Sequence, residues 1–180
     1  MSETEETWVV EGKRALVTGA SRGIGRAIAV QLASMGARVA CVATTAENCA
    51  GTVAECLGST EGACAYGVDV ADTDAVGSLI KEVQAEFGGL DILVNNAGLG
   101  QDVSAVSQLS DAQWNRVLRV TLTGTFHCCR AAAGIMERQE QGTITNIASI
   151  NGQNPAALVA AYNVAKAGVI SLTRTLALEL

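Results

Sequence analysis

Thr18-Gly19-Ala20-Ser21-Arg22-Gly23-Ile24-Gly25 is a glycine-rich turn between an apolar run, Ala15-Leu16-Val17, and a helical pattern from Ile24 to Met35. A bend between a strand and a helix needs a residue that tolerates positive φ, and Gly19 suits that position. Gly23 and Gly25 lack a Cβ atom, so a phosphate can contact the backbone and the helix can pack closely on the sheet. The free N–H groups and the dipole at the helix start then favour an anion.

The spacing of these glycines leaves two interpretations open. Its form, G-x3-G-x-G, differs from the G-x-G-x-x-G fingerprint of dinucleotide-binding folds. A turn of this kind can also be a tight strand–helix connection that binds nothing. The rest of the sequence has to distinguish a phosphate site from such a connection.

Composition narrows the classes of protein to which the chain can belong. Hydrophobic residues make up 49% of the 180 residues, charged residues 17% and aromatic residues 3%, which is typical of aliphatic helices packed on a parallel sheet. We expect one domain, residues 1–180, with a sizeable core. The net charge of −6 and the lack of a basic tract argue against nucleic-acid binding. No window approaches the ~20 apolar residues that span a bilayer, so we expect no membrane segment.

The N-terminus, the cysteines and the single histidine predict a cytoplasmic protein without a metal site. Residues 1–6 are acidic and polar, unlike a secretory or mitochondrial presequence. The cysteines form no C-x-x-C pair, and one histidine is too few for an ordinary zinc site. We expect all seven side chains to be ordinary parts of the core: Cys41, Cys49, Cys56, Cys64, Cys128, Cys129 and His127.

Strands and helices alternate along the chain. The expected strands cover residues 9–18 (with a polar turn at 11–13), 38–43, 63–68, 90–94 and 143–148. The expected helices cover 23–35, 45–57, 74–87, a long helix that begins after a capping box at Ser110 and carries Trp114 to Phe126, and 156–180. We expect Ile24, Ile28, Gln31, Leu32 and Met35 to share one, mostly apolar, face of the first helix.

This alternation predicts an α/β fold with a doubly wound parallel sheet, Rossmann-like, in three α/β/α layers. Ligands in such sheets bind beyond the carboxyl ends of the strands. Gly19, Asp69, Asn95 and Ser149 each follow an expected strand. We therefore expect them to lie at one edge of the sheet.

Tyr162 and Lys166 are four residues apart on the last expected helix, so they share a face. A nearby ammonium group favours the phenolate form of a tyrosine, which would let Tyr162 exchange a proton near neutral pH. On its own, such a pair is most often plain helix surface. Ser149, at a strand end thirteen residues before Tyr162, favours an acid–base site instead.

The glycine-rich turn, Asn95-Asn96-Ala97-Gly98, Ser149 and Tyr162-Asn163-Val164-Ala165-Lys166 together resemble the short-chain dehydrogenase/reductase family in order and spacing. The resemblance extends from Gly12 to Leu180. It implies that Tyr162 donates a proton to a carbonyl oxygen while hydride arrives from a nicotinamide cofactor. It also implies that Ser149 polarises that oxygen and that Lys166 holds the nicotinamide ribose.

The resemblance implies further contacts with the cofactor. Asn95 would steady the central strand and approach the cofactor, and Asp69 would accept a hydrogen bond from the adenine amino group, with helix capping as the alternative for Asp69. The other implied cofactor contacts are Gly19, Ser21, Arg22, Gly23, Ile24, Gly25, Thr44, Val70, Ala97 and Gly98, together with Tyr162 and Lys166.

The end of the second expected strand favours NADP(H) over NAD(H). NAD enzymes place an acidic residue there for the ribose 2′-hydroxyl, whereas this chain has Ala43-Thr44-Thr45. Arg22 could contact a 2′-phosphate, because a guanidinium group suits such oxyanions. Its alternative role is that of a solvated turn residue.

Within the family, the glycine-rich turn and Ala43-Thr44-Thr45-Ala46-Glu47-Asn48 look most like 3-oxoacyl-[acyl-carrier-protein] reductases of fatty-acid synthesis. This implies an acyl-carrier-bound or small-molecule carbonyl substrate and a homo-oligomer, dimer or tetramer. The alternatives are a dehydrogenase of alcohols, sugars or steroids, and a weakly active nucleotide-binding subunit or inactive fragment.

Two departures from the family pattern bear on activity. Thr121 stands where the family has an asparagine that helps to hold a water molecule of the proton relay. A hydroxyl group offers fewer hydrogen bonds than an amide, so we expect slower turnover. The apolar pattern still continues at Leu180, so we expect the last strands of the fold to be lacking and the fifth strand to be an open sheet edge.

Overall fold

The structure is a computed structural model that describes residues 10–60 and 62–180, and the predicted strand start at residue 9 and the acidic residues 1–6 lie outside these ranges. Five parallel strands form one sheet in the order β3-β2-β1-β4-β5. They are β1 (Arg14–Thr18), β2 (Arg38–Ala43), β3 (Ala63–Gly67), β4 (Ile92–Asn95) and β5 (Thr143–Asn146). Among the described strands, β5 pairs with β4 alone and forms an edge.

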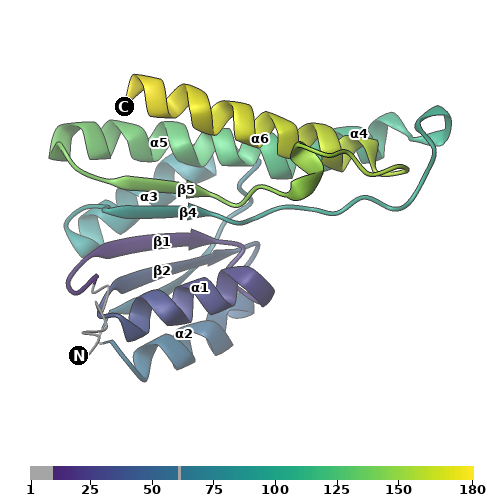
Figure 1. Cartoon of the computed structure of the whole chain (residues 1–180). Helices are drawn as coiled ribbons and strands as arrows, with labels where there is room; N and C mark the ends of the chain where they lie inside the picture. The colour runs from purple at the N-terminus through teal and green to yellow at the C-terminus, as the bar shows by residue number, and fades with distance from the viewer. Residues whose placement is uncertain (1–9, 61) are drawn as a thin grey trace, which may run out of the picture.

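Helices cover both faces of the sheet (Figure 1). On one face lie α1 (Gly23–Ser34), then the short η1 (Glu47–Cys49) and α2 (Ala50–Leu57). On the other lie α3 (Thr73–Phe87), α5 (Gly124–Gln139) and α6 (Ala160–Glu179), with α4 (Asp111–Leu118) and the short η2 (Val106–Gln108) and η4 (Ile150–Gly152) towards one end. The three layers and the doubly wound parallel sheet confirm the predicted fold class.

Successive strand residues face opposite layers, which divides the core in two. Leu16 and Leu93 pack with Leu79 of α3 and Ile135 of α5 on one face. Val17 and Val94 pack on the other face, in a second cluster that contains the alanines of α1. In the centre of the sheet, Leu16 is in register with both Ala40 of β2 and Leu93 of β4.

The buried face of α1 differs from the predicted one. Gly25, Ala29 and Ala33 are buried, whereas Ile24 is 63% exposed. The prediction that Ile24 belongs to the core-facing stripe is therefore wrong. At Gly25 a larger residue has no room, because a Cβ atom there would collide with the Gly19 carbonyl in the turn after β1.

The predicted long helix after Ser110 is two helices joined by a π turn, Arg119–Thr123. A π turn accommodates an extra residue within a helix. Thr121 lies at its centre, where its Oγ1 accepts a hydrogen bond from Leu99 N (3.0 Å). Thr125 Oγ1 donates to the carbonyl of Thr121 (2.9 Å). The hydroxyl groups of both threonines therefore form hydrogen bonds at the π turn.

Other boundaries shift by a few residues. The last helix begins at Ala160 instead of residue 156, because Leu158 adopts a left-handed φ of 66° that a helix cannot contain. The fourth strand begins at Ile92, two residues later than predicted. The helix predicted from residue 45 begins as the short η1 and becomes α-helical at Ala50. Ser110 caps α4 as predicted, and Asp72 caps α3.

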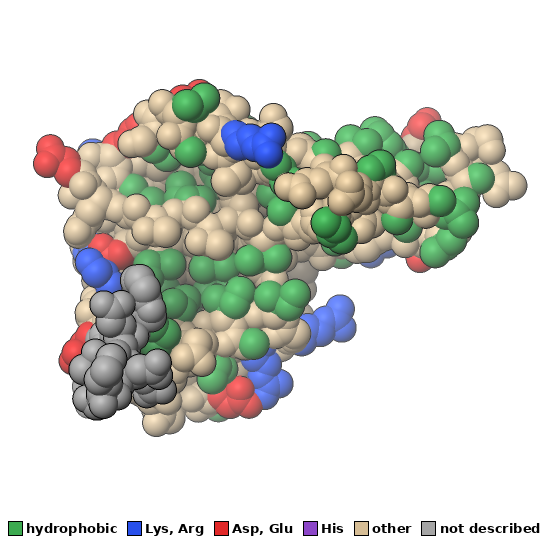
Figure 2. Space-filling model, in the orientation of Figure 1, with side chains coloured by type: hydrophobic (Ala, Val, Ile, Leu, Met, Phe, Trp, Pro, Cys, Tyr) green, Lys and Arg blue, Asp and Glu red, His purple; other side chains and the backbone are tan. Residues whose placement is uncertain are grey.

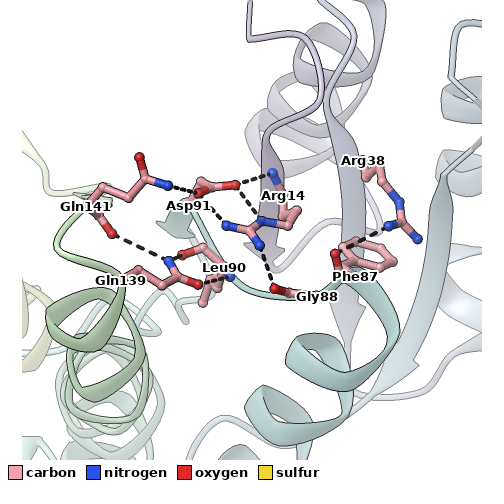
Figure 3. Close-up of polar contacts among 8 residues, drawn as sticks. All are labelled: Arg14, Arg38, Phe87, Gly88, Leu90, Asp91, Gln139 and Gln141. Carbon is pink, nitrogen blue, oxygen red and sulfur yellow. Dashed lines mark hydrogen bonds and ion pairs between the residues drawn. The ribbon is translucent and has the colours of Figure 1, made fainter.

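An ion pair joins the amino ends of β1 and β4 (Figure 3). Arg14 Nε and Nη2 donate to the two carboxylate oxygens of Asp91, each at 2.7 Å, and Arg14 Nη1 donates to the carbonyl of Gly88 (2.6 Å). The Gln139 side chain accepts from Leu90 N (3.1 Å) and donates to Leu90 O (2.8 Å). The hydrogen bonds from Arg14 hold the pKa of Asp91 below its usual value.

A set of hydrogen bonds joins the carboxyl ends of the same two strands. Thr18 Oγ1 accepts hydrogen bonds from the backbone N–H groups of Asn96 and Ala97, both at 3.0 Å. Asn96 Nδ2 donates to the carbonyls of Thr18 and Gly19, both at 3.1 Å. The turn after β1 and the segment after β4 are thus bound to each other.

Within the ranges 10–60 and 62–180, none of the helices combines the length and apolar character needed to cross a bilayer.

We expect Asp91→Asn to lower the free energy of unfolding by about 2–3 kcal/mol at pH 7, because the partly buried Arg14 would lose its anion. The folded-state pKa of Asp91 lies below its unfolded value. The pair therefore contributes fully above about pH 4, and its contribution falls as the pH drops through the folded-state pKa. Urea denaturation of both proteins should show a difference that shrinks below about pH 4.

The control for this experiment is Asp102→Asn, at an exposed carboxylate. It should change the free energy of unfolding by less than about 0.5 kcal/mol at every pH. Similar losses for Asp91→Asn and Asp102→Asn would contradict the assigned role of the ion pair.

We expect Thr18→Val to cost about 2 kcal/mol in the free energy of unfolding. Thr18 is buried, and a valine of similar shape would leave the N–H groups of Asn96 and Ala97 without their acceptor. Guanidinium denaturation measures this cost. Thr175→Val, at an exposed site in α6, is the matched control and should leave the free energy of unfolding nearly unchanged. An equally small effect of Thr18→Val would contradict the role given to the Thr18 hydrogen bonds.

Candidate functional site

A cavity of about 1310 Å³ lies beyond the carboxyl ends of the first four strands. It is walled by the turn after β1, the ends of β2 and β3, the segment after β4, and one side of α4. The predicted cofactor residues that line it are Gly19, Ser21, Arg22, Gly23, Ile24, Thr44, Asp69, Val70, Ala97 and Gly98. The structure therefore gathers most of the predicted cofactor site around one space.

The three glycines of the turn have different roles. Gly19 has a φ of 65°, and a Cβ atom there would lie 2.9 Å from Ala97 Cα. A Cβ atom on Gly25 would collide with the Gly19 carbonyl and the Asn96 side chain, so this glycine serves packing beneath the turn. Gly23 has a φ of 57° and open space where a Cβ would point, which suits a ligand in contact with backbone.

The charges around the cavity suit an anionic ligand. The first turn of α1 contains no acidic residue, and its N-cap, Arg22, makes no capping hydrogen bond with its side chain. The backbone N–H groups at that helix start are therefore available to an anion. Of the described residues that line the cavity, Arg22, Arg116 and Arg119 are cationic and Asp69 is the one carboxylate. These features fit a dinucleotide phosphate.

Asp69 stands at the cavity wall after β3. Its Oδ1 accepts from Ala71 N (3.0 Å), and its Oδ2 lies 3.4 Å from Arg119 Nη2. The alternative that Asp69 caps a helix is wrong, because Asp72 fills that position for α3. Asp69 is half-exposed and retains room for a further hydrogen-bond donor.

Three of the predicted catalytic residues, Ser149, Tyr162 and Lys166, lie on η4 and α6 or next to them, and these two elements pack against each other. Lys166 is buried in α6, and its Nζ donates to the carbonyl of Ile147 (2.5 Å), two residues before Ser149. The same Nζ lies 5.9 Å from the centre of the Tyr162 ring. Burial lowers the pKa of Lys166. The ammonium group is thus held between the end of the β5 segment and the phenol.

Two contacts bring Ser149 to this helix. Ser149 Oγ accepts from Asn151 N (3.2 Å), which shapes η4, and Asn151 Nδ2 donates to Asn163 Oδ1 of α6 (3.1 Å). Gly152 allows the close approach, because a Cβ atom there would lie 2.8 Å from backbone atoms of Lys166. The segment from Ile147 to Gly152, which contains Ser149, therefore packs against the part of α6 that carries Tyr162 and Lys166.

Four predicted cofactor contacts are not among the described residues that line the cavity: Gly25, Asn95, Tyr162 and Lys166. Asn95 is 3% exposed, and its Nδ2 donates to Asn146 Oδ1 (2.8 Å) and Cys129 Sγ (3.2 Å). It binds β4 to β5, while its neighbour Asn96 reaches the cavity. Asn95 thus steadies the sheet as predicted, whereas its approach to a cofactor stays a prediction.

Thr121 lies near Gly98, whose added Cβ would be 3.5 Å from Thr121 Oγ1. The Thr121 hydroxyl is buried and hydrogen-bonded to backbone N and O of Leu99 (3.0 and 3.4 Å). It holds the segment after Gly98 in place. A part for Thr121 in a proton relay stays a prediction.

Sequence reasoning missed several residues at this site. Arg116 and Arg119 line the cavity from α4 and the π turn, and their three-residue spacing was a usable sign of a shared helix face. Asn48 lines it too and donates to Thr44 Oγ1 (3.3 Å). Nothing in the sequence marked Gly152, since its role depends on a contact with a distant helix.

The cysteines and the histidine take no part in this site. Five cysteines are buried as predicted, whereas Cys64 is half-buried and donates to Glu86 Oε1 (2.8 Å). Burial raises the pKa of Cys64 to about 11, which disfavours a reactive thiolate. His127 is also half-buried, with Nδ1 3.1 Å from Val70 O. Within the described ranges, no group of three or more His, Cys, Asp or Glu side chains could hold a metal ion.

Sequence relatives place these features in a known family. The family model for short chain dehydrogenases matches residues 13–180. The 3-oxoacyl-[acyl-carrier-protein] reductase FabG of Staphylococcus aureus (strain N315) is 44% identical over 171 residues, which are 93% of this chain and 68% of that protein. FabG of Escherichia coli (strain K12) is 40% identical over 169 residues, 94% of this chain and 68% of that protein.

Solved structures agree with this assignment. NAD+-bound xylitol dehydrogenase superposes with a TM-score of 0.91 at 35% identity, covering 94% of this chain and 65% of that one. A metagenomic short-chain oxidoreductase in complex with NADP gives a TM-score of 0.90 at 38% identity, covering 94% of this chain and 77% of that one. The chain belongs to the short-chain dehydrogenase/reductase family.

Proposed function

We propose that the protein is an NADP(H)-dependent oxidoreductase that reduces the 3-oxo group of an acyl thioester carried on an acyl-carrier protein. The observation that carries the proposal is the grouping of Ser149, Tyr162 and Lys166 at the edge of the sheet that also holds the cationic cavity. The FabG relatives, at 40–44% identity, support the choice of substrate class.

Each residue of the group has a chemical role in this proposal. The cofactor, when bound, would supply a hydride to the carbonyl carbon of the substrate. Tyr162 donates its phenolic proton to the carbonyl oxygen, and the Ser149 hydroxyl donates a hydrogen bond to the same oxygen. The Lys166 ammonium, near the Tyr162 ring, favours the phenolate that remains, and the ribose of the cofactor is its further partner.

The cofactor preference follows from the residues around the cavity. The end of β2 offers Thr44, and Asn48 beside it, in place of a carboxylate. Arg22 is exposed at the mouth of the glycine turn, where a guanidinium group would bind a 2′-phosphate. Asp69 would accept from the adenine amino group, with Val70 against the ring. The NADP-bound structural relative supports the same preference.

We also propose a cytoplasmic homo-oligomer, a dimer or a tetramer. The family resemblance implies subunit contacts through the long helix and the last helix. Phe126 of α5 is 40% exposed and Val164 of α6 is 46% exposed, and both lie on those elements. Exposed apolar side chains at such positions support a partner surface.

The xylitol dehydrogenase relative favours a second candidate, oxidation of a polyol or related alcohol. A panel of acetoacetyl thioester, xylitol and a hydroxysteroid separates the two. Turnover of the thioester with NADPH supports the leading proposal, and turnover of alcohols alone supports the alternative. Cofactor binding without turnover of any substrate would indicate a nucleotide-binding subunit.

We expect Tyr162→Phe to lower kcat for NADPH-dependent reduction of an acetoacetyl thioester by about a thousandfold, because the proton donor is lost. The Kd of NADPH, measured by fluorescence titration, should stay within about twofold. Tyr66→Phe is the control: Tyr66 OH donates to Glu86 Oε2 (2.5 Å), away from the site. Full turnover by Tyr162→Phe would refute the proposed chemistry.

We expect Arg22→Gln to raise the Kd of NADPH by about tenfold and to leave the Kd of NADH nearly unchanged, since only the 2′-phosphate needs the guanidinium group. Arg26→Gln is the matched control, because Arg26 pairs with Glu55 and does not line the cavity. Equal weakening of both cofactors by Arg22→Gln would show that Arg22 does not discriminate between them.

A further inference from the structure

The helix that carries Tyr162 and Lys166 begins without a cap of its own. Its N-cap residue, Val159, makes no side-chain hydrogen bond to the helix. The first N–H groups of a helix need acceptors from elsewhere. Gln101, 60 residues earlier in the sequence, supplies one: its Oε1 accepts from Ala161 N (2.8 Å) and from Tyr162 N (3.4 Å).

Gln101 also holds the turn that precedes this helix. Leu158 has a φ of 66°, a left-handed conformation that is unfavourable for leucine. Its carbonyl accepts from Ser104 N (3.0 Å) and Gln101 Nε2 (3.3 Å). One amide side chain therefore binds both the strained turn and the first turn of α6.

These hydrogen bonds lie in a part of the chain where apolar side chains are exposed to solvent. The segment after β4 and the segment before α6 project together beyond the sheet (Figure 1). Figure 2 shows hydrophobic side chains at the surface of this projection, and Val103 and Val106 are 72% and 73% exposed. Further along, Val117, Ala161 and Ala165 pack α6 against α4. Packing thus fixes the axis of α6, whereas Gln101 fixes the place where it begins.

We propose that Gln101 is a positioning residue for Tyr162. Its amide oxygen accepts hydrogen bonds from the backbone N–H groups of Ala161 and Tyr162 and so fixes the first turn of α6. The position of that turn determines where the Tyr162 phenol lies. The Gln101 side chain contacts the backbone of Ala161, Tyr162 and Leu158, so in this proposal it acts through the start of the helix. The inference rests on the proposed role of Tyr162.

Two substitutions separate the hydrogen bonds from the bulk of the side chain. Gln101→Met keeps length and removes the acceptor. Gln101→Glu keeps an oxygen acceptor for the N–H groups of Ala161 and Tyr162, where its charge is favourable at a helix start, and loses only the donor to the Leu158 carbonyl. Gln108→Met, in the same projection, is the control: Gln108 is exposed, and none of the described side-chain hydrogen bonds involves it.

The first measurement needs no turnover. The chain has two tyrosines, so ring-labelled tyrosine gives two NMR signals that Tyr66→Phe assigns. In Gln101→Met we expect the Tyr162 signal to shift or broaden while the Tyr66 signal, which reports an intact fold, stays in place. We also expect amide exchange at Ala161 and Tyr162 to become about five- to tenfold faster. Gln101→Glu and Gln108→Met should match the wild type.

The second measurement is steady-state kinetics with NADPH and an acetoacetyl thioester. We expect Gln101→Met to lower kcat about tenfold with KM for NADPH unchanged, and Gln101→Glu to restore kcat. Unchanged exchange and ring signals in Gln101→Met, or faster exchange with unchanged kcat, would overturn the proposal. If the wild type has no turnover, the proposed function fails, and the NMR data still decide whether Gln101 positions Tyr162.

Discussion

The close approach of two chain segments, the turn after β1 and the segment after β4, sustains the rest of this structure. Thr18 and Asn96 exchange four hydrogen bonds across it, counting those to the neighbouring backbone of Gly19 and Ala97. Gly25 brings α1 against the same point. Without this contact the glycine turn would have no fixed relation to β4, and the cavity would lose its floor.

The close contact between these two segments also bears on which features of the fold could be predicted from the sequence. Gly19 was recognisable because a positive φ favours glycine, and Gly23 because a phosphate site needs a residue without a Cβ atom. The strands were recognisable because a sheet buried on both faces requires continuous apolar runs. The stripe on α1 was misjudged at Ile24, since periodicity favours large apolar residues, whereas the tight contact at Gly25 selects small ones.

The candidate site, like the fold, could be predicted from the sequence only in part. The grouping of Ser149, Tyr162 and Lys166 follows from strand ends and helix periodicity, both of which are local properties. The roles of Asn96, Gly152 and Gln101 depend on contacts between segments distant in sequence, and a residue's type does not reveal such a contact. The π turn at Thr121 is of the same kind, because its hydroxyl is bound to Leu99.

The Arg14–Asp91 pair, which joins residues 77 positions apart, has a consequence for how the chain folds. The centre of the sheet is a pairing of β1 with β4, and everything between them must be looped out before that pairing forms. Closing a long loop carries an entropic cost before the pairing stabilises the chain, and topologies with such non-local pairings fold slowly. During synthesis β1 therefore has β2 as its only available neighbour until β4 has left the ribosome.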